Sequence, residues 1–345
     1  MDSALSDYLA QVTRLAGGSR AVPAGEGMEN RFGAGGRAER DGISPPPAPI
    51  ITPTAPITNP NQVVYPAKSW DWPDTVPGSI DFEQFAFADT VPASILANTE
   101  YAPTSNSFSE SYRTFLEYLD ASVPLLADAK ARIATPSYAP ASGPTPPGWT
   151  KTSVEGLTSW VPVWSLSDSA SAWKAKVDTG AIDNPGTLEL GAQNHGSLGS
   201  FLQGKPSDAD TPQDLVPNVA SVKMTARAWG QIAIYPGTWF EASMIKLGKS
   251  HVAQDGFFGN GGLLSGRVSA FLVAYGDITY EFASKDQSGV SLAKTVADAR
   301  DMRAFGIPVQ VAASQPPVAA GTTSVRLAAS TQNPAIVAVL IESFS

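Results

Sequence analysis

The chain has 345 residues, 43% of them hydrophobic, and carries a formal net charge of −9 at pH 7. This length suits one large or two modest domains with a real hydrophobic core. The acidic balance argues against nucleic acid as a partner and disfavours an anionic membrane, because both are bound by clustered Lys and Arg. The chain has no cysteine, which excludes disulfides and thiolate metal sites.

The N-terminus lacks the basic and then apolar order of a secretory signal peptide. The longest strongly apolar run, 335–341, is far shorter than the roughly 20 residues of a membrane-spanning helix. We therefore expect a soluble protein made in the cytoplasm, with no signal peptide and no transmembrane segment.

Residues 1–18 are predicted to form a short amphipathic helix that Ser3 can cap and Gly17 can end. Five apolar residues fall on one face of this helix: Leu5, Tyr8, Leu9, Val12 and Leu15. Residues 19–68 are rich in Gly and Pro, a composition that allows an extended or disordered arm but no helix or central strand. A helix on such a tether can dock on a partner or a neighbouring subunit. The alternatives are that it folds back onto its own body or is disordered.

Residues 69–135 are predicted to form an acidic region of helices and turns. The pattern aromatic-x-Asp-Thr-Val-Pro-x-Ser-Ile occurs at 72–80 and again at 87–95. Two copies are fewer than a stacked array needs, so we interpret them as two similar turns, with a ligand-binding pair as the alternative. Ser107 and Glu110 form a capping box for a helix with an apolar stripe. A Pro/Ser/Gly linker at 136–148 marks a predicted domain boundary.

Residues 149–345 are predicted to form a β-rich domain. Polar and apolar residues alternate from Ala220 to Ala228, which is typical of a strand with one face on a core. The run from Arg267 through Gly276-Asp277 to Phe282 predicts a β-hairpin with a two-residue primed turn. The expected fold class is α+β and β-rich. It combines an antiparallel sheet or sandwich in the C-terminal half, a few covering helices, and a disordered or extended Pro-rich N-terminal arm.

Aromatic side chains are dense enough in this domain to suggest a contact surface. The candidate binding residues are Trp160, Trp164, Trp173, Trp239, Phe257 and Phe258. Large flat rings offer much contact area at low entropy cost, which suits sugar stacking or the anchoring of a protein interface. For the tryptophans, the alternative is a place in the core with each N–H hydrogen-bonded.

Catalytic and metal-binding patterns are incomplete. The run 199–206 matches the glycine spacing and lysine of a phosphate loop, but Pro206 stands where Ser or Thr must reach magnesium. No Gly-x-Ser-x-Gly elbow occurs, and two histidines, His195 and His251, are too few for a zinc site built on histidine. The acidic loop 207–214 lacks the glycine and distal glutamate of an EF-hand. We predict no catalytic residue, metal or cofactor.

Three functions follow from these observations. The first is a non-enzymatic binding or assembly protein, whose β-rich body makes protein or glycan contacts and whose N-terminal helix and arm dock on a partner or on a subunit of a homo-oligomer. The second is a membrane-active protein of the pore-forming type, which the acidity disfavours. The third is a hydrolase acting on a sugar or an ester, with His195, Asp277 and Glu281 as its only candidate residues. The lack of a catalytic constellation favours the first.

Overall fold

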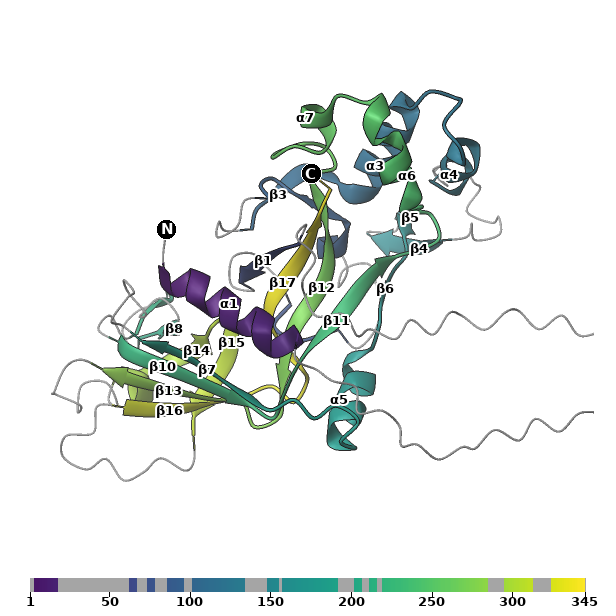
Figure 1. Cartoon of the computed structure of the whole chain (residues 1–345). Helices are drawn as coiled ribbons and strands as arrows, with labels where there is room; N and C mark the ends of the chain where they lie inside the picture. Colours follow the sequence, from purple (N-terminus) through teal and green to yellow (C-terminus); the bar gives the residue numbers. More distant parts are fainter. Residues whose placement is uncertain are drawn as a thin grey trace, which may run out of the picture.

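The computed structural model describes residues 3–17, 62–66, 73–77, 86–95, 101–133, 148–154, 157–191, 202–206, 211–215, 219–284, 295–312 and 324–344. Most of the predicted arm at 19–68 and of the predicted linker at 136–148 lies outside these residues, as does His195. The fold below is that of the described part of the chain (Figure 1).

Two antiparallel sheets form the body. The five-stranded sheet has the order β1 (Gln62–Pro66), β17 (Ala335–Ser343), β12 (Gly266–Tyr275), β11 (Ala228–Pro236) and β6 (Trp164–Leu166). The eight-stranded sheet has the order β7 (Gly186–Gly191), β10 (Val219–Ala226), β13 (Thr279–Ser284), β16 (Ser324–Ala329), β15 (Ile307–Val311), β14 (Arg300–Ala304), β8 (Leu202–Lys205) and β9 (Gln213–Asp214). The expected antiparallel, β-rich fold class is thereby confirmed.

Short hairpins and helices complete the fold. The two hairpins are β2 (Thr90–Pro92) with β3 (Pro103–Ser107), and β4 (Trp149–Val154) with β5 (Leu157–Pro162). The helices are α1 (Ser3–Gly17), η2 (Ala86–Asp89), α3 (Phe108–Tyr118), α4 (Leu126–Ile133), α5 (Ala170–Asp178), α6 (Ser243–Gly248), η6 (Lys249–His251) and α7 (Gln254–Phe257). Helices α3, α4, α6 and α7 gather at one end of the molecule, while α1 lies across the strands (Figure 1).

The two sheets are joined at a corner where two chain segments cross side by side. Strand β10 continues through Arg227 into β11, and β12 continues through Gly276 and Asp277 towards β13. The Arg227 N–H donates to the Gly276 carbonyl at 2.9 Å, and this hydrogen bond joins the two segments where they pass from one sheet to the other. Within the eight-stranded sheet β10 pairs with β13, and within the five-stranded sheet β11 pairs with β12.

The predicted hairpin between Arg267 and Phe282 is therefore wrong, although both of its strands exist. Gly276 and Asp277 have φ of +74° and +49°, the left-handed conformation that a primed turn needs. However, β12 pairs with β11 and β17, whereas β13 pairs with β10 and β16. The turn residues thus make a corner between two sheets instead of a hairpin within one.

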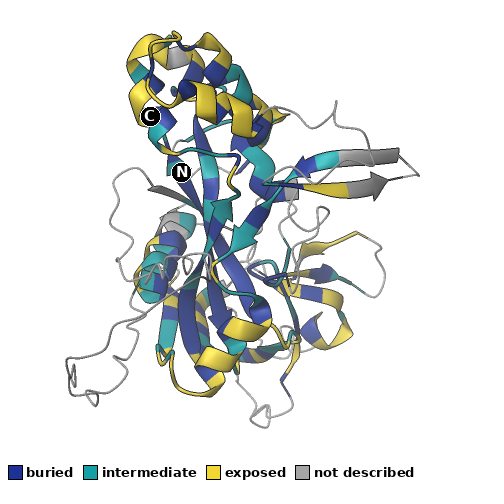
Figure 2. Ribbon diagram, turned by 90° about the vertical axis from the view of Figure 1, so that its right-hand side faces the viewer, coloured by how far each residue is buried: buried dark blue, intermediate teal, exposed yellow. Residues whose placement is uncertain are grey.

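The five-stranded sheet is buried on both faces. Strand β17 lies between β1 and β12, and all but one of its residues are buried. Along β12, Phe271 and Val273 belong to one hydrophobic cluster, whereas Leu272 and Ala274 belong to the other. The central strands accordingly appear buried along most of their length (Figure 2).

One of these clusters joins residues on both sides of the predicted 136–148 linker. Phe115 of α3 and Ile133 of α4 share it with Phe271 of β12. Ser107 accepts a hydrogen bond from the Glu110 N–H at the start of α3, as the capping box predicts.

Candidate functional site

The N-terminal helix covers a surface that both sheets contribute to. Helix α1 contacts β7 of the eight-stranded sheet and β1, β11, β12 and β17 of the five-stranded sheet. We call the part of these strands beneath α1 the α1-binding surface. Tyr8, Leu9 and Val12 are each at most 4% exposed, and Leu5 and Leu15 pack at the margin of the same cluster. The apolar face predicted for this helix is therefore the face that packs.

Tyr8 inserts deepest into this surface. Its hydroxyl donates to the Val337 carbonyl at 2.8 Å, and its ring stacks on Phe305 with centroids 4.8 Å apart. Phe305 in turn stacks on Tyr280 at 5.8 Å. Burial raises the pKa of Tyr8 far above its usual value, so this phenol stays neutral and acts as a hydrogen-bond donor.

Gln11 binds the open edge of a sheet. Strand β7 is the first strand of the eight-stranded sheet. The Gln11 side-chain amide donates to the Glu189 carbonyl at 2.6 Å, and its carbonyl oxygen accepts from the Glu189 N–H at 3.0 Å. The amide thus makes the two bonds that a neighbouring strand would make. This match is specific to a carboxamide at this position of α1.

The C-terminal turn of α1 is fixed by Asn184 and by a close contact. Asn184 Nδ2 donates to the Leu15 carbonyl at 2.7 Å, which satisfies one of the last carbonyls of the helix. A Cβ atom at Gly186 would lie 2.5 Å from Leu15 Cδ2, a distance that real Cβ atoms do not show. Only glycine at 186 lets Leu15 approach this closely.

The predicted helix residues are thus brought together, on the body of their own chain. Folding back was one of the alternatives to docking for this helix, and docking on a neighbour stays a prediction. Sequence reasoning missed Gln11, Asn184 and Gly186, because no local pattern distinguishes these three from ordinary surface or loop residues.

Most of the predicted aromatic binding residues lie in the core. Trp164, Trp173, Trp239, Phe257 and Phe258 are each at most 7% exposed. The burial of all five favours the packing alternative over surface contact.

The packing alternative expects each buried tryptophan N–H to be hydrogen-bonded, which holds for Trp239 but not for Trp164. The Trp239 Nε1–H donates to the Val163 carbonyl at 3.0 Å, whereas Trp164 Nε1 is buried with no hydrogen-bond partner among the described residues. Trp160 alone is partly exposed, and Lys151 lies over its ring at 4.9 Å on the β4–β5 hairpin.

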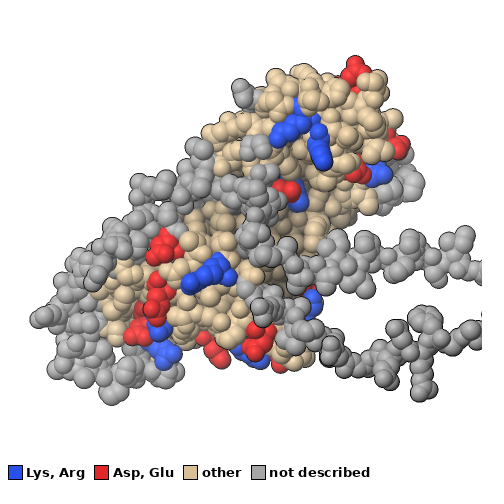
Figure 3. All heavy atoms as spheres, viewed as in Figure 1, with Lys and Arg blue, Asp and Glu red and all other residues tan. Residues whose placement is uncertain are grey.

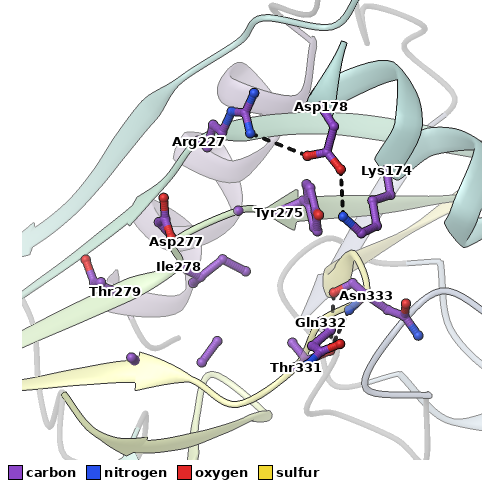
Figure 4. A pocket seen from close by; sticks show the side chains of 13 residues that line it. Lys174, Asp178, Arg227, Tyr275, Asp277, Ile278, Thr279, Thr331, Gln332 and Asn333 are labelled. Carbon is purple, nitrogen blue, oxygen red and sulfur yellow. Dashed lines mark hydrogen bonds and ion pairs between the residues drawn. The ribbon is translucent and has the colours of Figure 1, made fainter. Parts of the chain in front are cut away.

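A polar pocket of about 470 Å³ lies at the corner between the sheets. Helix α5 contributes Lys174 and Asp178, the corner itself contributes Arg227 and Asp277, and the 331–333 turn closes the opposite side (Figure 4). The pocket therefore forms where four parts of the sequence meet.

Charge compensation dominates this pocket. The Asp178 carboxylate lies 2.6 Å from Lys174 Nζ and 3.4 Å from an Arg227 nitrogen, and Lys174 Nζ lies over the Tyr275 ring at 5.1 Å. The hydrogen bond from Lys174 lowers the pKa of Asp178, and the same bond raises the pKa of Lys174. Both groups remain charged at neutral pH, so the pocket suits hydrogen bonding to a small polar molecule better than proton transfer.

Two of the three predicted hydrolase residues, Asp277 and Glu281, are described, and they do not both line the pocket. Asp277 lines the pocket, but Glu281 lies within β13, opposite Lys223 on one side and Arg326 on the other. His251 is exposed in η6. Among the described residues, no three His, Asp or Glu side chains lie close enough together to hold a metal ion.

A partly buried carboxyl at Asp89 went unrecognised in the sequence. It accepts hydrogen bonds from the Ser109 N–H at 2.8 Å and from Ser109 Oγ at 2.7 Å, at the start of α3. Burial raises its pKa to about 7, while the bonds from Ser109 act in the opposite direction. The repeated Asp-Thr-Val-Pro motif was the available signal, since Asp89 is the aspartate of its second copy.

Charged side chains are otherwise dispersed. On the face shown in Figure 3, Lys and Arg are interspersed with Asp and Glu over the described residues, and neither sign forms a broad patch. None of the helices in the described ranges is long and apolar enough to cross a membrane.

Comparisons with protein families, with curated proteins and with solved structures find no match for this chain.

Proposed function

We propose that this protein is a non-enzymatic assembly protein, in which α1 is a docking element and the α1-binding surface is its receptor. The proposal rests on one observation: α1 carries a buried apolar face and side chains matched to that surface, yet residues 18–61 separate it from the next described element. A helix joined through so long a segment is suited to making contacts between chains.

The polar pocket supports a non-enzymatic function. Its central carboxylate, Asp178, is held between two cations, and the described residues that line the pocket with its other carboxylate, Asp277, include no histidine, serine or cysteine to act as base or nucleophile. We therefore assign contact, and not turnover, to this molecule.

The experiment compares two substitutions on opposite faces of α1. Val12 is fully buried, whereas Ala10 is exposed. Val12→Asp should detach the helix, because burying an unpaired carboxylate costs several kcal/mol, while Ala10→Asp adds the same charge without touching the body. Light scattering over a range of concentrations should show oligomers for the wild type and for Ala10→Asp, and monomers for Val12→Asp.

Two results would contradict the proposal. The first is a wild-type chain that stays monomeric at every concentration. The second is a Val12→Asp variant with the molar mass of the wild type, since docking of α1 would then be irrelevant to assembly. Far-ultraviolet circular dichroism checks that the sheets of both variants remain folded.

A further inference from the structure

We infer that in the assembled protein the α1-binding surface of each body holds the α1 of a second copy, so that neighbouring chains exchange their N-terminal helices. This inference rests on the proposed function and names the partner of the same site. It concerns which chain supplies the helix, while the contacts themselves are those described above.

The surface identifies its own occupant. It offers an edge-strand N–H and carbonyl at Glu189 to the Gln11 amide, a backbone carbonyl at Val337 to the Tyr8 hydroxyl, and a side-chain donor at Asn184 to the helix C-terminus. An unrelated amphipathic helix would fill the apolar contacts but would leave the buried Val337 carbonyl without its hydrogen bond and would lose the matched bonds at Glu189 and Asn184. The partner that fits is a second copy of this chain.

The length of the connection permits the exchange. Helix α1 lies against β1, and the two elements are only about 22 and 17 Å long. A connection within one chain therefore needs to cross less than roughly 50 Å. The segment 18–61 can span up to roughly 150 Å, whereas a body of this size is roughly 50 Å across. The connection is long enough to pass from one body to the next.

When α1 docks on a second copy, it makes the same contacts as when it docks on its own body. The free energies of the two arrangements therefore differ only in the cost of the connecting segment and of bringing two chains together. The effective concentration that a flexible connection provides is greatest when its length matches the span and falls as it becomes longer, so exchange competes with folding back as the protein concentration rises. Bodies with a net charge of −9 repel one another, which favours association through a specific helix over non-specific contact. A reciprocal pair forms two such contacts at once and closes without leaving a free surface.

The absence of cysteine allows a direct test, because engineered thiols will be the only ones present. One full-length chain carries Gln11→Cys and an affinity tag that changes its mass, and the other full-length chain carries Glu189→Cys. The two are expressed together and treated with a short bismaleimide. We expect a product that contains one chain of each kind, in several-fold excess over the same experiment with Ala10→Cys in place of Gln11→Cys, because Ala10 faces away from the body.

A complementation experiment supplies an independent readout. Val12→Asp removes a functional helix but keeps the surface, whereas Gly186→Leu obstructs the surface at Leu15 but keeps the helix. Each variant alone should be monomeric. With exchange, a mixture of the two forms a mixed dimer through one intact contact, and light scattering detects the rise in molar mass.

The inference is overturned if the wild type assembles while the mixed cross-linked product is no more abundant with Gln11→Cys than with Ala10→Cys and the complementation mixture stays monomeric. In that case the proposed assembly function would survive. A wild type that is monomeric in the same samples would overturn both.

Discussion

At the scale of single residues, the most informative group is the Asp89 carboxyl beneath the start of α3. Its pKa is raised from 3.8 to about 7, chiefly by burial. The pKa of Asp89 is higher in the folded state than in the unfolded state, so the protonated form stabilises the fold. Its contribution to the free energy of unfolding is complete below about pH 4, falls as the pH rises towards 7, and is absent at higher pH.

We predict that Asp89→Asn removes this pH dependence. Between pH 5 and pH 8 the unfolding free energy of the wild type should fall by about 1–2 kcal/mol more than that of the variant. This difference is smaller than the free energy that corresponds to the whole pKa shift, because Asp89 is partly exposed to solvent. Urea unfolding at the two pH values measures both proteins. Parallel pH profiles would show that Asp89 does not titrate in this range.

The buried tyrosines Tyr8, on α1, and Tyr280, beneath it, should respond differently to loss of their hydroxyls. The Tyr8 hydroxyl donates to the Val337 carbonyl, whereas the Tyr280 hydroxyl is buried with no hydrogen-bond partner among the described residues. Tyr8→Phe should lower the unfolding free energy by about 1 kcal/mol. Tyr280→Phe should leave it unchanged or raise it, because an unsatisfied polar group is removed. Chemical denaturation tests the pair, and a larger loss for Tyr280→Phe than for Tyr8→Phe would refute the assignment.

At the scale of elements, the sequence predicts the strands better than their pairing. Alternation identified β10, because the period of the side chains along a strand is a local property of the chain. The pairing of β12 with β13 was predicted from Gly276-Asp277 and is wrong. Turn chemistry reports only the left-handed backbone, while the choice of partner depends on β11 and β17, which are distant in sequence.

The corner glycine offers a matched test of this interpretation. Gly276 and Gly180 have similar φ values of +74° and +76°, but a Cβ at Gly276 would lie 2.9 Å from Arg227 Cβ, whereas a Cβ at Gly180 meets nothing within 4 Å. Gly180→Ala should cost about 1 kcal/mol for its backbone conformation alone. Gly276→Ala should lower the unfolding free energy by about 1–2 kcal/mol more, because the added Cβ forces the segments at Arg227 and Gly276 apart. Equal losses in thermal or urea unfolding would show that the crossings are not tightly packed.

The candidate site, too, could be predicted only where the signal is local in the sequence. The helical period predicted the apolar face of α1, with Tyr8 and Val12 at its centre. The polar matches made by Gln11 and Asn184 were beyond reach, since they depend on an edge strand and a loop that the chain brings together only when both sheets have formed.

At the scale of the whole molecule, the sequence predicts a β-rich body but leaves open whether its aromatic residues pack in the core or form a contact surface. Tryptophans such as Trp164 and Trp239 fill the space between the five-stranded sheet and the end helices, where their rings pack edge to face 5.5 Å apart. Composition counts large rings but does not distinguish a thick core from an exposed contact surface.

The corner at Arg227 and Gly276 has a consequence for how the body comes apart. Two continuous segments run from one sheet into the other and are tied at the crossing, so tension on either sheet reaches the other through covalent bonds. The two halves should therefore melt in a single cooperative transition, and a pulling force applied at the ends of the body should meet one mechanical barrier instead of two in succession.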